Sequence, residues 1–193
     1  MGMPAERTRR WIAREVRQLI ADAPLATPRY ELVDGELLVT PSPAPPHQMA
    51  VSLLLVALSL YCEREGVGEA LSSPSDIELE PEDVRQPDVY VVSPAEWRRI
   101  ARDGFPAREL VLAIEVVSPS SGRADRVKKR PGYQTHVPEY WIVDTDARIV
   151  ERWRPGDSRP EIVDKQLEWA PSGARRAFEL NLPKFFERVA GEL

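Results

Sequence analysis

The chain of 193 residues is long enough for one domain with a sizeable core, and its length does not require two. Its 42% hydrophobic and 30% charged residues are typical of globular proteins, and its net charge of −5 disfavours a protein that coats nucleic acid through bulk positive charge. The single cysteine, Cys62, excludes an internal disulfide framework and suits a reducing compartment. Because Cys62 lies in an apolar helical run, we expect a buried, inert thiol.

The sequence carries no pattern that predicts export or a membrane span. Its first twenty residues contain several arginines and lack the apolar core of a signal peptide. The longest apolar stretch, MAVSLLLVALSLY (49–61), is too short to span a bilayer and predicts a core helix. We therefore expect a cytoplasmic protein without a membrane partner.

The N-terminal part predicts two helices on either side of a hairpin. Residues 5–22 form an amphipathic helical pattern, with apolar side chains on one face and arginines opposite. YELVDGELLV (30–39) predicts two short strands about an Asp-Gly turn. The prolines of TPSPAPPH (40–47) delay the next helix, which we expect over 47–65 with its end at Gly66.

The rest of the chain alternates between strands and short helices, which predicts an α/β (α+β) fold with a mixed central sheet in a single domain. No internal repeat is evident. The expected elements are strands at 75–80 and 87–92, a helix at 93–101 capped by Ser93, a buried strand at 110–117, a polar helix at about 122–135, a hairpin of 139–144 with 149–155, and a short helix near the C-terminus.

The buried strand contains a carboxylate in an unusual place. LVLAIEVV (110–117) is apolar except for Glu115, and an unbroken apolar run of this length predicts a strand buried on both faces. An ionised carboxylate is costly there unless it is paired, protonated or bound to a metal. Glu115 is therefore a candidate functional residue.

Two further features lie on neighbouring elements. Asp88 opens the strand at 87–92, and the segment RADRVKKR places Lys128 and Lys129 on the helix after Glu115. If the two strands are adjacent, two carboxylates and an ammonium converge at one edge of the sheet. Two carboxylates can hold Mg²⁺, which acidifies a bound water, while a lysine orients that water or stabilises charge on a phosphate. This set of residues predicts metal-assisted phosphodiester hydrolysis.

Each member of this set also has a purely structural interpretation. Asp88 after a proline is often a turn or strand-start residue. Asp125 and Lys129 stand at i and i+4, which suits a surface helix pair, and the charged cluster is typical of a solvated helix face. A structural ion pair between Glu115 and Lys129 is a further alternative.

Five motifs of the sequence resemble a known family. YELVDGELLV, PSP…H, QPDVYVV, LAIEVVSPSS…D…K…Y and VPEYWIVD occur in the order found in the Uma-two family, over about residues 28–187. The resemblance implies a bacterial, restriction-endonuclease-like domain with the PD-(D/E)XK nuclease core, flanked by helices and carrying an N-terminal hairpin and helix. We expect this domain over 28–193 and a helical extension over 1–27.

The resemblance assigns roles to several of these positions. It makes Asp88 the aspartate of the PD element and Glu115 the acidic residue of the (D/E)XK element, both as metal ligands. Val117 stands where the ordinary motif has its lysine. Lys129 matches the lysine of D…K…Y on the following helix, with Asp125 and Tyr133 as its flanks, and Lys128 ranks second.

Two N-terminal residues match other positions of the family. Glu31 either supplies a further carboxylate at the metal or is a surface residue of the hairpin. His47 is expected to form hydrogen bonds at a helix start rather than to bind metal, since no second His or Cys stands at metal spacing.

The resemblance implies DNA as the substrate and Mg²⁺ or Mn²⁺ as the cofactor of an endonuclease. Residues 118–140 hold five basic and two acidic side chains, a net charge of +3, which could face a phosphate backbone. A non-catalytic nucleic-acid-binding or regulatory module of the same fold is the alternative. Because nucleases of this fold often pair to cut two strands, a homodimer is left open. The expected nucleic-acid contacts are Arg123, Arg126, Lys128 and Arg130.

Overall fold

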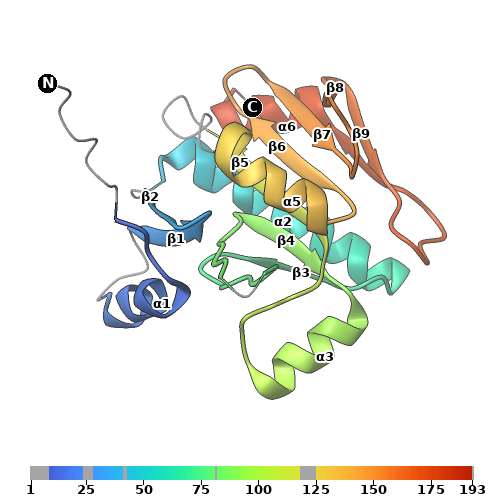
Figure 1. The fold of residues 1–193 in the computed structure, drawn as a ribbon. Coiled ribbons are helices and arrows are strands. Elements are labelled where there is room, and N and C mark those ends of the chain that lie inside the picture. The colour runs from blue at the N-terminus through green and yellow to red at the C-terminus, as the bar shows by residue number, and fades with distance from the viewer. Residues whose placement is uncertain (1–8, 24–27, 41–42, 81, 118–124, 193) are drawn as a thin grey trace, which may run out of the picture.

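The computed structural model describes residues 9–23, 28–40, 43–80, 82–117 and 125–192. Its centre is a six-stranded sheet in the order β3-β4-β5-β6-β7-β8 (Figure 1). β5 and β6 run parallel, and the other neighbouring pairs of this sheet run antiparallel, so the predicted mixed sheet is confirmed. The strands are β3 (Glu69–Ser72), β4 (Val89–Val92), β5 (Leu110–Val117), β6 (Tyr140–Asp144), β7 (Ile149–Trp153) and β8 (Glu161–Val163).

Helices cover both faces of this sheet. On one face, α2 (Pro45–Glu65) and α6 (Leu182–Ala190) share a core with Ile114 of β5. On the other face, α3 (Pro94–Asp103) and α5 (Arg130–His136) share a core with Ala113, and α5 lies in front of the sheet in Figure 1. Since successive residues of a strand point to opposite faces, Glu115 lies on the same face as Ala113, the face that α5 covers.

The N-terminal elements form a smaller unit beside the sheet. The predicted hairpin is β1 (Arg29–Val33) with β2 (Glu36–Thr40), and α1 (Ala13–Asp22) packs against β1. Leu32 exchanges two backbone hydrogen bonds with Val84, which fixes the hairpin to the segment before β4. A second hairpin of β9 (Gln166–Trp169) and β10 (Phe178–Asn181) completes the core beneath α2.

Two predicted helix starts differ from the structure. α2 begins at Pro45, two residues before the predicted start, because prolines are tolerated in a first turn where no N–H is needed. It ends at Gly66 with φ 68°, as predicted. Within the described residues α1 begins at Ala13, because the Trp11 backbone N–H donates to Gly35 of the hairpin instead of entering a helix, and residues 5–8 of the predicted helix lie outside the described residues.

The predicted strand at 75–80 is wrong. Ile77 is fully buried, but it forms only isolated bridges to Arg85 and Ala107 within the described chain. The edge strand beside β4 is instead β3, whose sequence EALS has no alternating pattern. β8, β9 and β10 were also missed, whereas the predicted strands at 87–92 and 110–117 and the hairpin of β6 with β7 are confirmed.

The helix expected at 122–135 has two parts. Residues 125–129 form a short π-helix, η1 (Asp125–Lys129), and α5 continues from Arg130, while 122–124 lie outside the described residues. Pro131 falls in the first turn of α5, which suits a residue without an N–H. The helix type therefore changes between Lys129 and Arg130, directly before Pro131.

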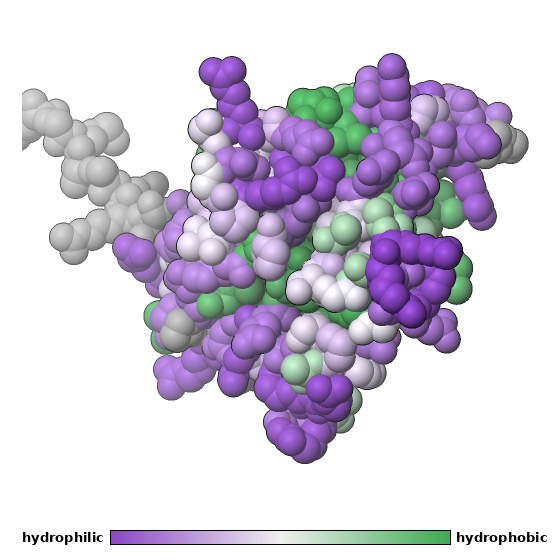
Figure 2. All heavy atoms as spheres, turned by 90° about the vertical axis from the view of Figure 1, so that its right-hand side faces the viewer, coloured by the Kyte–Doolittle hydropathy of each residue, from purple (hydrophilic) through white to green (hydrophobic). Residues whose placement is uncertain are grey.

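One described helix, α2, is long and apolar enough by length and composition to cross a membrane. Our expectation that this stretch is too short for a span is therefore wrong. Its buried residues, such as Leu54 and Leu58, pack in the core of the sheet, which confirms the predicted core helix. Cys62 of this helix is buried and free, as predicted. The face of the molecule in Figure 2 is largely hydrophilic, with smaller hydrophobic areas between the charged side chains.

Candidate active site

The structure brings Asp88 and Glu115 onto neighbouring strands. β4 pairs with β5 so that Val89 faces Ile114, and one further step of the same antiparallel register sets Asp88 opposite Glu115. The backbone N–H of Val116 donates to Oδ2 of Asp88 at 2.8 Å. Both carboxylates are almost fully buried. The two strands are therefore adjacent, as the predicted convergence of Asp88 and Glu115 requires.

The helix after β5 delivers Lys129 to this sheet edge. Its Nζ donates to Oε1 of Glu115 at 3.1 Å and lies 2.7 Å from Oε2 of Glu31. Lys129 is buried, so the alternative of a surface helix pair with Asp125 is wrong for Lys129. The lysine that the sequence placed on the following helix therefore contacts Glu115.

Glu31 is an internal residue and not a hairpin surface residue. It is fully buried, and its Oε1 accepts the backbone N–H of Gln86 at 2.9 Å. The surface interpretation failed because β1 lies against the segment before β4, so that its inner face points toward Lys129. Glu31 therefore belongs to the cluster as a third carboxyl group.

Tyr133 contacts the same oxygen of Glu115 from α5. Its hydroxyl donates to Oε1 of Glu115 at 3.3 Å, and its ring stacks on Tyr140 at 4.8 Å between centroids. Burial, reinforced by the charges of Glu115 and Glu31, raises the pKa of the phenol well above its usual value. Tyr133 therefore stays a neutral hydrogen-bond donor to Glu115. Tyr140 and Trp141 are fully buried residues of β6.

Asp88 is held by two basic side chains. Arg29 Nη1 lies 2.8 Å from Oδ1, and His47 Nε2 lies 3.0 Å from Oδ2. Burial raises the pKa of Asp88, but the His47 hydrogen bond, the Arg29 charge and the Val116 N–H outweigh it and hold the pKa at about 2. Asp88 is thus an ionised acceptor, and His47 forms the hydrogen bond expected at the start of α2.

Sequence reasoning missed Arg29. It stands two residues before Glu31 on β1, so the two side chains share one face of the strand. This i, i+2 pair of opposite charges on one strand was the signal available in the sequence. Arg29 connects the hairpin to Asp88, as Glu31 connects it to Lys129.

A pocket of ≈ 290 Å³ opens beside Asp88. Of the three buried carboxyl groups only Asp88 lines it, so the pocket reaches the cluster at Asp88 and not at Glu115 or Glu31. Its polar lining consists of Arg29, His47, Gln48, Ser52, Ser73 and Asp88.

The predicted nucleic-acid contacts make intramolecular ion pairs and hydrogen bonds where the structure describes them. Arg126 pairs with Asp144 and Glu151, and Lys128, which is half-exposed, pairs with Glu36 on β2 and does not join the cluster. Arg130 packs over Trp153 and donates to Gln134. Arg123 and the side chain of Asp125 lie outside the described residues.

The donor set fits a hard divalent cation. In the described parts of the chain there is no group of three or more His, Cys, Asp or Glu placed to hold a metal. Mg²⁺, however, is commonly bound through one or two carboxylates with water as the remaining ligands. Within the described residues, Arg29 pairs with Asp88, and Lys129 pairs with Glu31 and Glu115. Asp88 and Glu115 are oxygen donors of the type that Mg²⁺ binds.

Comparison with known proteins identifies the family of this sequence and a solved structure with the same fold. The sequence profile described as "Uma2: Putative restriction endonuclease" matches residues 15–183. The crystal structure of "a putative nuclease belonging to DUF820 from Anabaena variabilis" is similar with a TM-score of 0.69 at 18% identity, and the match covers 88% of this chain and 96% of that chain. At this identity the similarity shows a shared fold, and no curated protein matches the sequence. Because the family match spans most of the chain, the protein belongs to the Uma2 family.

Proposed function

We propose that the protein is a metal-dependent endonuclease that hydrolyses phosphodiester bonds in DNA. The family and the fold support a restriction-endonuclease-like nuclease. The observation that carries the proposal is the contact of Lys129 with Glu115 beside Asp88. These three residue types, converging at one edge of a sheet, are the equipment for attack of a water molecule on a phosphate.

In this proposal Asp88 and Glu115 hold Mg²⁺ or Mn²⁺. The ion supplies a Lewis acid that lowers the pKa of a bound water and polarises a phosphoryl oxygen. Lys129 donates to the attacking water or to a developing phosphate charge. Tyr133 fixes the orientation of Glu115 through its hydroxyl, and Glu31 holds the ammonium of Lys129 in place.

The second candidate is a non-catalytic module that binds nucleic acid or regulates a partner. It is favoured by the contacts of Asp88, whose two oxygens already engage Arg29, His47 and a backbone N–H. If those contacts persist in solution, a metal ion gains little access to Asp88. The two candidates therefore differ first in metal uptake and only then in cleavage.

The experiment is calorimetry with Mn²⁺ and Mg²⁺, followed by incubation of the protein with plasmid DNA, single-stranded DNA and RNA. The isosteric variants Asp88→Asn and Glu115→Gln preserve the shape of the cluster. We expect wild-type protein to bind the ion and cut DNA, and both variants to lose the two properties. Glu96→Gln is the matched control, because Glu96 is a buried carboxylate paired with Arg99 on α3, away from the cluster.

Three outcomes would contradict the proposal. Absence of metal binding and cleavage in the folded wild-type protein supports the non-catalytic module. Full cleavage by the doubly substituted protein removes Asp88 and Glu115 from the chemistry. An equal loss of metal binding and cleavage in Glu96→Gln would show that the substituted proteins fail because they are less stable.

A further inference from the structure

We propose that Arg85 is the positioning residue for Lys129, and this inference rests on the proposed function. Arg85 lies on the segment between β3 and β4 and is almost fully buried. Its backbone N–H and C=O both form hydrogen bonds with the backbone of Ile77, so the backbone of Arg85 is held in place. Its side chain crosses to the helical turn that carries Lys129.

The first contact is with the backbone of the lysine itself. Nη1 of Arg85 donates to the carbonyl oxygen of Lys129 at 2.6 Å. This carbonyl lies at the junction of η1 and α5, where the helical hydrogen-bond pattern changes. A charge-assisted hydrogen bond at this point fixes the backbone from which the lysine side chain extends.

The second contact explains why residue 132 is a glycine. A Cβ at Gly132 would lie 2.1 Å from Nη2 of Arg85 and 2.6 Å from its Cζ, closer than any real contact. The backbone of Gly132 does not have the positive φ that favours glycine, so the approach of the guanidinium is the reason for the small residue. Arg85 and Gly132 form one close-packed contact.

The third contact links Arg85 to the carboxylate of Glu115 through Tyr133. The Arg85 guanidinium lies over the ring of Tyr133, 4.9 Å from its centroid, and the Tyr133 hydroxyl donates to Glu115. Arg85 therefore holds the turn at Lys129 and at Tyr133, the two residues of this helix that donate to the same oxygen of Glu115.

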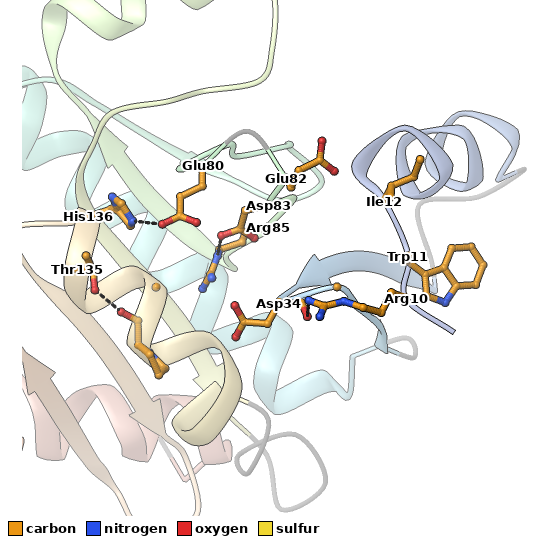
Figure 3. Close-up of a pocket in the computed structure, with 13 residues that line it drawn as sticks. Arg10, Trp11, Ile12, Asp34, Glu80, Glu82, Asp83, Arg85, Thr135 and His136 are labelled. Atoms are coloured by element: carbon orange, nitrogen blue, oxygen red, sulfur yellow. Dashed lines mark hydrogen bonds and ion pairs between the residues drawn. The ribbon is translucent and has the colours of Figure 1, made fainter. Parts of the chain in front are cut away.

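The charge of Arg85 is balanced away from the cluster. Its Nε donates to Oδ2 of Asp83 at 2.5 Å. Figure 3 shows Asp83 and Arg85 pointing toward one another in the wall of a pocket of ≈ 720 Å³, with Thr135 and His136 of α5 across from them. Asp83 neutralises the guanidinium of Arg85. Arg85 can therefore bind the backbone carbonyl of Lys129 without placing a second uncompensated positive charge near the Lys129 ammonium.

The test is a double-substitution cycle with Arg85→Met and Lys129→Met, measured as kcat and KM for metal-dependent DNA cleavage. A misplaced catalytic group costs up to about 100-fold, so we expect Arg85→Met to lower kcat by about 10- to 100-fold with KM changed less than about twofold. In the Lys129→Met background the same substitution should lower kcat less than about twofold, because the group it positions is absent. Gly132→Ala, which displaces the guanidinium but keeps its charge, should behave as Arg85→Met does.

Arg152→Met is the matched control. Arg152 is a partly buried arginine on β7 that pairs with Glu139, so we expect its loss to lower stability without moving the helix of Lys129. We expect the control to lower the melting temperature and to leave kcat within about twofold. Equal loss of kcat in Arg152→Met, or multiplicative losses in the double variant of Arg85 and Lys129, would overturn the inference.

A crystal structure of the Arg85→Met protein gives a readout independent of activity. We expect Lys129 Nζ to lie beyond hydrogen-bonding distance of Glu115 Oε1, and an unchanged 3.1 Å contact refutes the positioning role. Folded wild-type protein that binds no metal and cuts no nucleic acid instead refutes the proposed function, and the position of Lys129 in the variant structure still decides the role of Arg85.

Discussion

Nζ of Lys129 lies 2.7 Å from Oε2 of Glu31, so a residue of the N-terminal hairpin contacts a residue of the helix after β5. Both side chains are buried. The hairpin therefore contributes to the candidate site through Glu31 as well as through Arg29, which pairs with Asp88.

Lys129→Met should abolish most cleavage and preserve metal binding. Loss of a preorganised donor typically costs 10²- to 10³-fold in kcat, so a drop of about 10²-fold is expected. Removal of a positive charge beside Glu115 should leave the affinity for Mn²⁺ equal or higher. Plasmid cleavage and calorimetry measure the two effects.

Lys128→Met is the control for this prediction, because Lys128 is half-exposed and pairs with Glu36 on the surface. We expect it to retain wild-type kcat. A loss equal to that of Lys129→Met would show that general basicity of the helix, and not the contact with Glu115, is responsible.

Glu31→Gln should destabilise the fold strongly. The neutral amide weakens the charge-assisted contacts of this side chain with Lys129 and with the Gln86 N–H, and hydrogen bonds to charged groups contribute about 1.5–3 kcal/mol, while Lys129 keeps its pair with Glu115. We expect a loss of about 2 kcal/mol in the free energy of unfolding by urea. Glu36→Gln, on the neighbouring strand and more than half exposed, should change it by less than about 0.5 kcal/mol. Equal effects of the two substitutions would contradict a buried role for Glu31.

The parts of the fold that follow from local pattern could be predicted. The apolar run 110–117 became a buried strand, and the Asp-Gly turn adopted positive φ at Asp34 and Gly35 as a tight hairpin requires. The segment 75–80 alternates like a strand, yet Ile77 is held by single bridges, because its neighbours in space come from distant parts of the chain.

The site was predictable only in part for the same reason. A buried carboxylate in an apolar strand is visible in the sequence, and so is a lysine on the next helix. The pairing of Arg29 with Asp88 and the approach of Arg85 to Lys129 depend on tertiary packing of the hairpin and of the segment before β4. The metal, the DNA specificity and the roles of these residues stay predictions that the experiments above test.

Cys62 should be unreactive in the folded protein. Burial, with a smaller contribution from the charge of Glu69, raises the pKa of its thiol to about 11. At pH 8 only about one thiol in a thousand is ionised at such a pKa, and the thiolate is the nucleophile. We expect negligible reaction with Ellman's reagent in native buffer and complete reaction in urea at the same pH. Rapid reaction of the native protein would show that the end of α2 opens readily.

Asp144 should give stability that depends on pH. Its carboxylate accepts from the backbone N–H groups of Asp146 and Ala147 and from Arg126 at 2.7 Å. Burial opposes its ionisation, but the Ala147 N–H and Arg126 outweigh burial and hold its pKa below the usual range. A carboxyl group with a lowered pKa in the folded state stabilises the fold above its unfolded pKa of about 3.9, and this stability is lost as the pH falls through the folded pKa.

Asp144→Asn should therefore lower the free energy of unfolding by about 1 kcal/mol at pH 7, since the charge-assisted bonds are weakened. The difference from wild-type protein should shrink as the pH falls below about 3.9, because the unfolded wild-type chain then takes up a proton at Asp144 before the folded protein does. Urea unfolding of both proteins at pH 7, 5 and 3 measures this dependence. A difference that is constant over this range would mean that shape, and not the charge of Asp144, connects η1 to the turn between β6 and β7.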